Sequence, residues 1–134
     1  MNTEEIVQFM IETGAPIEAD ALLQIENYFN LMIGDERVMR IEDEGDLIAI
    51  VTYSICNDYF DYYAKDIWDY EPHNPLEDTV YVEKLISKRW NIALRKLISQ
   101  KLIEKYPSLT RGIWHRARTN EDSIIKINRR FTYV

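Results

Sequence analysis

The sequence predicts an α/β (α+β) fold in which a central, mostly antiparallel sheet is flanked by helices. Apolar residues recur at helical spacing near the N-terminus and again over residues 88–105, and apolar runs of strand length lie between and after these stretches. The 134 residues are 46% hydrophobic and 29% charged, which is typical of a globular protein with a sizeable core. We therefore expect one domain spanning residues 1–134.

Two helices are expected before the sheet. Residues 2–14 start with a cap residue and acidic side chains and stop at Gly14, as a short amphipathic helix does. The apolar residues of this helix are Ile6, Val7 and Met10. A second helix is expected from about Glu18 to Met32, with Gly34 as its stop signal.

A β-hairpin is expected over residues 37–55, because two apolar runs flank the polar stretch EDEGD, which contains a glycine. The second strand of this hairpin, Leu47–Ile55, is apolar almost throughout. Strands of this kind are covered on both faces, so we expect this one at the centre of the sheet.

The second half of the chain predicts a strand at Thr79–Ile86, a helix over residues 88–105 and another strand over residues 111–118. Ser87 is the expected N-cap of the helix, and Pro107 is expected to close it. The side chains expected to face the core are Ala93, Leu94, Leu97, Ile98 and Leu102.

The C-terminal residues predict a short helix followed by a strand. Residues 119–130 begin with a cap residue and acidic side chains and continue with several isoleucines, which favours a helix. The last four residues, 131–134, are expected to form a short terminal strand.

Aromatic and acidic residues alternate in the segment 57–75, which holds six of the 16 aromatic residues of the chain. Tyrosine and tryptophan are favoured at protein interfaces, whereas interleaved acids disfavour stacking on nucleic acid. The segment therefore predicts a protein interface formed by Tyr59, Phe60, Tyr62, Tyr63, Trp68 and Tyr70. The alternative is an irregular excursion that covers the sheet.

Charge is divided unequally along the chain. Residues 1–80 contain 19 acidic and 3 basic side chains, whereas residues 81–134 contain 4 acidic and 13 basic ones. Either the two halves neutralise each other, or the basic half meets an anion such as a cofactor phosphate, a nucleic acid or an acidic protein patch. The acidic first half disfavours general binding to nucleic acid.

Several classes of site and of location are disfavoured by the residues themselves. No window approaches the roughly 18 apolar residues of a membrane helix, and the acidic N-terminus lacks the features of a secretory signal. Cys56 is the only cysteine, so no intrachain disulfide is expected, as in a reducing compartment. His73 and His115 each lack a second ligand at metal-binding spacing, so no metal site is expected.

The element order, together with the stretches VYVEKLISKRW, RKLI and HRARTNEDSIIKINRRF, resembles the Gcn5-related N-acetyltransferase (GNAT) family over roughly the whole chain. The resemblance implies a GNAT-like fold. In that family a glycine-rich turn between the central strand and a helix binds the pyrophosphate of coenzyme A. In this chain Arg89 falls on the family's Arg/Gln, but Trp90, Ile92 and Leu94 stand where the family has glycine.

The resemblance also implies positions for a site. Residues that would bind the cofactor are Lys88, Arg89, Trp90, Asn91 and Asn120. Glu83 lies on the central strand where some members carry a general base, although it is alternatively a solvated carboxylate or the partner of Lys84 or Arg40. Ile127 occupies the position of the tyrosine that often acts as the general acid.

The C-terminal half, through the spacing of KLI, L-x-EKY, W, N and F, is also similar to small acetyltransferase-like proteins of tailed bacteriophages. This resemblance implies a virion or assembly component. The missing glycines and the missing tyrosine favour a non-catalytic protein without a cofactor, which would act through protein contacts as a homo-oligomer or with virion proteins. It would be located in the virion or the host cytoplasm and not be secreted. The alternative function is an acetyl-CoA-dependent N-acetyltransferase with a glycine-free turn.

Overall fold

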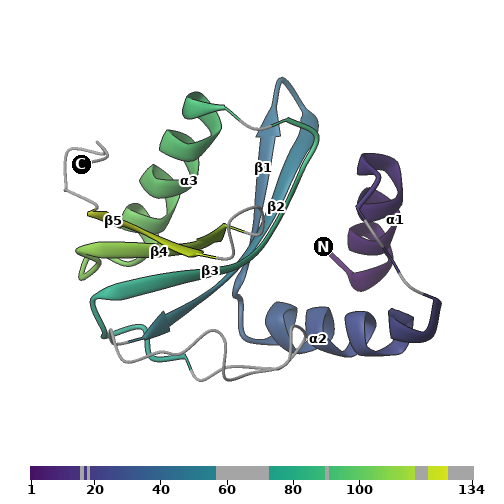
Figure 1. Ribbon diagram of the computed structural model, residues 1–134, viewed down its shortest axis with the longest axis horizontal. Coiled ribbons are helices and arrows are strands. Elements are labelled where there is room, and N and C mark those ends of the chain that lie inside the picture. Colours follow the sequence, from purple (N-terminus) through teal and green to yellow (C-terminus); the bar gives the residue numbers. More distant parts are fainter. Residues whose placement is uncertain (16, 18, 57–72, 90, 117–120, 127–134) are drawn as a thin grey trace. The chain divides into compact units, whose positions relative to one another are not determined.

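The computed structural model describes residues 1–134 except 16, 18, 57–72, 90, 117–120 and 127–134, and for residues 19, 56, 113–116 and 121–126 it describes the backbone alone. The chain forms two compact units. Of the described residues, the first unit comprises those within 1–52 and 84–88, and the second comprises those within 53–56, 73–83 and 89–126. Figure 1 shows the elements of both units.

The first helix, α1 (Thr3–Thr13), confirms the prediction at both ends. The side chain of Asn2 accepts a hydrogen bond from the N–H of Glu5 at 3.0 Å, which satisfies one of the free N–H groups of the first turn. Gly14 ends the helix in the left-handed conformation, with φ at 75°, which a glycine adopts without steric cost.

The second helix begins and ends later than predicted. A short 3-10 turn, η1 (Ala19–Ala21), precedes α2 (Leu22–Gly34), so Gly34, the expected stop, is the last residue of the helix. The left-handed residue after α2 is Glu36, with φ at 59°, and the N–H of Arg37 donates to the carbonyl of Met32 at 2.9 Å. The residue in the left-handed conformation after a helix is usually glycine, so the sequence suggested Gly34, whereas Glu36 takes this conformation.

The predicted hairpin is confirmed, with β1 (Val38–Asp43) antiparallel to β2 (Asp46–Cys56). Asp43 pairs with Asp46, so Glu44 and Gly45 form a two-residue turn, and their φ values of 52° and 82° are both left-handed. A turn of this kind matches the right-handed twist of the strands that it joins.

Strand β2 is buried along most of its length, as predicted. All residues from Ile48 to Ile55 are buried, and β2 lies between β1 and β3 (Thr79–Ser87) in the sheet order β1-β2-β3-β4-β5. The prediction of a central strand covered on both faces is therefore confirmed.

The next helix, α3 (Ile92–Lys105), starts four residues later than predicted, and Ser87 is the last residue of β3 rather than a helix cap. Its cap is Asn91, whose side chain accepts from the N–H of Leu94 at 2.8 Å. Ala93 is exposed, contrary to prediction, because the buried face is formed by Leu94, Ile98, Ser99, Leu102 and Ile103. Ala93 precedes Leu94 by about 100° of helix rotation and so falls away from that face.

The predicted last helix is wrong. Residues Glu121–Lys126 form a strand, β5, which pairs antiparallel with β4 (Arg111–Arg116), and β4 in turn pairs parallel with β3. The stretch EDSIIK resembles a helix start because of its acids, but adjacent β-branched isoleucines favour a strand once a partner edge is present. The predicted terminal strand, 131–134, lies outside the described residues.

Each unit has its own apolar core, and the predicted mixed α and β architecture is confirmed. In the first unit, α1 and α2 pack against β2 through buried residues that include Phe9, Phe29, Met32 and Ile50. In the second unit, α3 connects the parallel strands β3 and β4, as a helical crossover must (Figure 1).

We predict that replacing Gly45 by alanine lowers the free energy of unfolding by about 1–2 kcal/mol. A Cβ at this position meets no atom within 4 Å, so the loss comes from the left-handed backbone alone. Urea denaturation measures the effect, with Glu44→Asn as the control, since asparagine tolerates this conformation. An unchanged midpoint for Gly45→Ala would show that the turn adopts another conformation.

Candidate functional site

The junction between β3 and α3, where the resemblance implies a pyrophosphate, is built without glycine. Ser87 ends the strand and Asn91 caps the helix. The side-chain oxygen of Asn91 accepts from the N–H of Leu94, which places a partially negative oxygen against the first turn of α3. An incoming anion competes with that oxygen, because helix N-terminal N–H groups bind anions through the same positions.

The predicted basic residues of the junction are divided between the two units. Lys88 belongs to the first unit, where its ammonium group contacts Asp46 at 3.2 and 3.4 Å and its N–H donates to the carbonyl of Ile48. Arg89 belongs to the second unit and is exposed. Trp90 and Asn120 lie outside the described residues.

Glu83, the predicted general base, is buried with 6% of its surface exposed. Its carboxylate accepts a hydrogen bond from the hydroxyl of Ser54 at 2.9 Å, which joins the two central strands within the second unit. A general base must reach the proton that it removes, either directly or through one water. The hydrogen bond from Ser54 links Glu83 on β3 to β2. Arg40, one of its predicted partners, instead contacts Glu5 and Glu42.

A polar cluster around the buried Tyr53, absent from the sequence predictions, lies at the edge of the core of the second unit. The hydroxyl of Tyr53 lies 3.1 Å from that of Tyr106 and accepts from Lys105 at 3.1 Å. His73 contacts both rings edge-on, and its Nδ1 accepts from the N–H of Ile55 at 2.9 Å. The signal in the sequence was a tyrosine inside an apolar strand, since a buried tyrosine hydroxyl needs a partner.

That cluster fixes the chain after residue 72 to β2. Besides the bond to His73, Ile55 accepts from the N–H of Asn74 at 2.9 Å, and the hydroxyl of Ser108 donates to the carbonyl of Glu77 at 3.0 Å. His73 is therefore the anchor of a turn, which agrees with the predicted turn at EPHNP. Because Nδ1 accepts a hydrogen bond, the proton of the neutral ring lies on Nε2.

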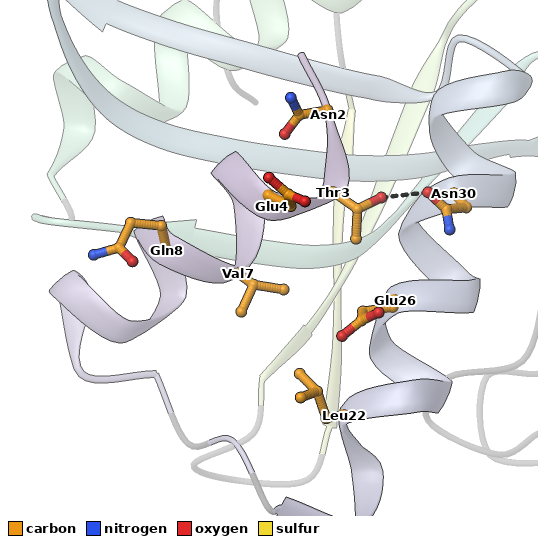
Figure 2. Close-up of a pocket in the computed structure, with 8 residues that line it drawn as sticks. All are labelled: Asn2, Thr3, Glu4, Val7, Gln8, Leu22, Glu26 and Asn30. Atoms are coloured by element: carbon orange, nitrogen blue, oxygen red, sulfur yellow. Dashed lines mark hydrogen bonds between the residues drawn. The ribbon is translucent and has the colours of Figure 1, made fainter.

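A groove of about 580 Å³ lies between α1 and α2 in the first unit. Its lining combines two carboxylates, three amides and an apolar floor, formed by Asn2, Thr3, Glu4, Val7, Gln8, Leu22, Glu26 and Asn30. Figure 2 shows Val7 and Glu26 between the two helices, and Thr3 donating to Asn30 at one end of the groove. The groove can accept hydrogen-bond donors and positive charge.

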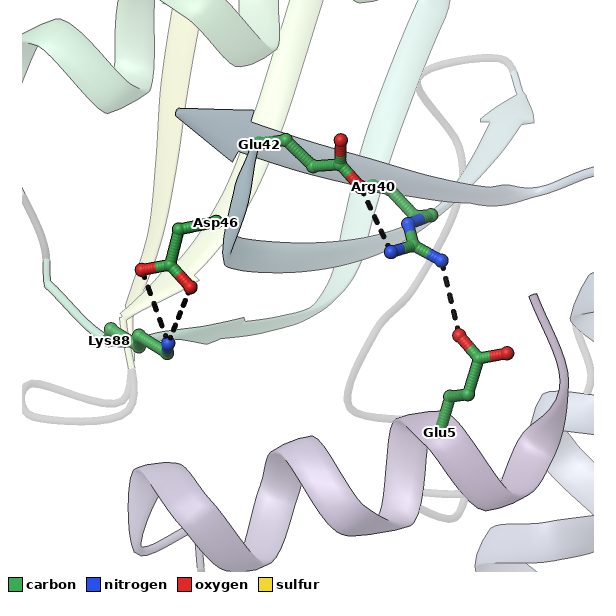
Figure 3. A network of polar contacts seen from close by, with 5 residues as sticks. All are labelled: Glu5, Arg40, Glu42, Asp46 and Lys88. Carbon is green, nitrogen blue, oxygen red and sulfur yellow. Dashed lines mark hydrogen bonds and ion pairs between the residues drawn. The ribbon is translucent and has the colours of Figure 1, made fainter. Parts of the chain in front are cut away.

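A second groove, of about 510 Å³, lies on the side of α1 that faces β2. It shares Glu4 and Gln8 with the first groove, so these two side chains stand between the grooves. Figure 3 shows ion pairs of three residues that line it: Lys88 contacts Asp46 at 3.2 Å, and Glu5 contacts Arg40 at 3.1 Å. Arg40 also contacts Glu42 at 2.9 Å. Such exposed ion pairs contribute about 0–1 kcal/mol each, so they orient side chains more than they stabilise the fold.

The remaining site predictions concern residues or features that the structure tests only in part. The predicted interface residues, from Tyr59 to Tyr70, lie outside the described residues. Within the described part of the chain, no three His, Cys, Asp or Glu side chains are placed to hold a metal ion. No helix of that part has the length and apolar character needed to cross a membrane.

Comparison of the chain with models of protein families, with curated proteins and with solved structures finds no match.

We predict that Asn91→Ala lowers the free energy of unfolding by about 1 kcal/mol, because it removes the oxygen that satisfies the N–H of Leu94. Asn91→Asp keeps an acceptor there and is the matched control. Chemical denaturation of the three proteins measures the difference. Equal stability of the alanine and aspartate variants would contradict this role of Asn91.

We predict that Glu83→Ala destabilises the chain by about 2 kcal/mol or more, because it leaves the buried hydroxyl of Ser54 without this acceptor and creates a cavity. Replacing both partners, in the pair Glu83→Ala with Ser54→Ala, is expected to cost less than the sum of the single changes. Additive losses in a double-mutant cycle would show that the two side chains act independently.

Proposed function

We propose that this chain is a non-catalytic GNAT-like protein that acts through contacts with other proteins. The observation that carries the proposal is the cap of α3, where the side chain of Asn91 itself accepts from the first turn. In the family that the sequence resembles, this helix end holds the coenzyme A pyrophosphate on backbone N–H groups beside glycines.

The state of the other implied catalytic positions supports the same proposal. Glu83 is buried and bonded to Ser54, so it lacks the access that a base for an acceptor amine requires. Lys88, which the resemblance assigns to cofactor binding, contacts the carboxylate of Asp46. Acyl transfer needs a bound thioester together with a base that reaches the amine, and neither position is arranged for these tasks.

The likeness to the GNAT fold rests on the order of the elements from α1 to β4. A hairpin follows two N-terminal helices, and β3, α3 and β4 form a parallel strand–helix–strand unit in which residues 79–82 pair with residues 111–114. The helix that the sequence predicts after β4 is replaced by β5, so this part of the chain does not support the likeness.

The second candidate is an acetyl-CoA-dependent N-acetyltransferase with an atypical turn. One observation favours it: Arg89 is exposed close to the N-terminus of α3, at the position that the resemblance assigns to a phosphate contact. An arginine near a helix N-terminus can hold an anion without glycine, because the guanidinium supplies several donors.

Titration with acetyl-CoA separates the two candidates. We expect the free energy of unfolding to stay unchanged at millimolar acetyl-CoA, whereas a ligand at 100 times its dissociation constant would raise it by about 2.7 kcal/mol. Inorganic pyrophosphate is the matched control, because it reports anion binding alone. Saturable stabilisation by acetyl-CoA that pyrophosphate does not reproduce would overturn the proposal.

A further inference from the structure

Two hydrogen bonds hold the turn that begins at His73 on the end of β2, within the second unit. The N–H of Ile55 donates to Nδ1 of His73 at 2.9 Å, and the N–H of Asn74 donates to the carbonyl of Ile55 at 2.9 Å. Both backbone groups of Ile55 are therefore bonded to this turn. We call these two hydrogen bonds the His73 anchor.

The bond from Ile55 requires a neutral imidazole. Nδ1 accepts a hydrogen bond only through a free lone pair, which it has in the neutral ring whose proton lies on Nε2. Protonation places a second N–H on Nδ1, so that two donors point at each other across 2.9 Å. The charged ring therefore cannot keep this bond, and the N–H of Ile55 loses its acceptor.

The side chains that surround the ring also oppose a positive charge on it. Tyr53 on β2 and Tyr106 at the end of α3 contact His73 edge-on, with ring centroids 6.3 and 6.0 Å away. The ammonium group of Lys105 lies 5.9 and 5.5 Å from the centroids of the same two tyrosine rings. A second cation beside these rings is repelled by Lys105, whereas the phenols stay neutral until about pH 10.

The nearby carboxylates of the second unit form hydrogen bonds with other groups. Glu83 accepts from Ser54, whose side chain lies on the opposite face of β2 from that of Tyr53, because successive side chains of a strand alternate. On the segment that follows His73, the carboxylate of Asp78 accepts from the hydroxyl of Thr79 at 2.9 Å.

We propose that His73 is a pH-sensitive switch, which holds the turn on β2 when its ring is neutral and releases it when the ring is protonated. The release is local, because farther along the segment the hydroxyl of Ser108 donates to the carbonyl of Glu77, and the N–H of Thr110 donates to the carbonyl of Asp78 at 2.8 Å. Neither of these bonds contains a titrating group. The inference goes beyond the proposed function and does not depend on it, since none of these residues lies at the junction between β3 and α3.

The direction of the pH dependence follows from which state binds the proton. The released ring takes up a proton with the ordinary histidine pKa of about 6.5, whereas the anchored ring must stay neutral. The anchor is therefore complete above that pH and weakens as the pH falls below it. At pH 5, about 1.5 pH units below this value, release is favoured about thirtyfold more than at pH 8.

Amide hydrogen exchange of the full chain, resolved by residue with NMR, tests the switch. We expect the protection factor of the Ile55 amide to fall about thirtyfold between pH 8 and pH 5, after correction for intrinsic exchange. The amide of Thr110 is the internal control and is expected to keep its protection. Unchanged protection of Ile55, or an equal loss at Thr110, would overturn the local release.

Substitution of His73 separates the titration of this ring from other effects of pH. His73→Asn keeps a side-chain acceptor but does not titrate, and His73→Ala removes the acceptor, so the difference between the two pH values is expected to vanish in both. His73→Ala is also expected to have low protection of Ile55 at both pH values. The matched control is His115→Asn, which removes the other histidine of the chain and is expected to behave like the wild type. A loss of protection at pH 5 that persists in His73→Asn would refute the switch.

Discussion

The burial of β2 is the constraint on which the rest of the structure depends. Every residue from Ile48 to Ile55 is buried, so both faces of the strand must be covered and each polar group on it needs a partner. Three side chains meet this need: Thr52 bonds to Tyr28 at 2.8 Å, Tyr53 to Tyr106, and Ser54 to Glu83. Within the first unit these bonds link β2 to α2, and within the second unit they link β2 to β3 and to the end of α3.

The need of β2 for hydrogen-bond partners also involves Glu83, the carboxylate that the sequence predicts to be a general base. Glu83 is buried and accepts a hydrogen bond from the hydroxyl of Ser54 inside the sheet. Asn91 also accepts a hydrogen bond, because its side-chain oxygen is the partner of the N–H of Leu94 in the first turn of α3. Glu83 and Asn91 thus each accept a hydrogen bond that contributes to local structure, within the sheet and at the start of α3.

Prediction from the sequence succeeded where a signal is local. Gly14 and the Glu44–Gly45 turn require left-handed backbone, and both features mark boundaries that the structure confirms. It failed at Ser87 and in the segment Glu121–Lys126, where cap-like and acidic residues suggested helix starts. In both places pairing with another strand decided the outcome, and such pairing is not visible in a local pattern.

The sequence by itself determined the class of fold, the central strand and the division of charge, because apolar periodicity and composition are properties of the chain alone. Only the tertiary structure decided which polar side chains form hydrogen bonds inside the protein. The bonds of Glu83 to Ser54 and of His73 to Ile55 join residues that are far apart in the sequence. Whether a carboxylate or an imidazole is available for chemistry depends on such contacts, and these form only when separate strands and turns pack together.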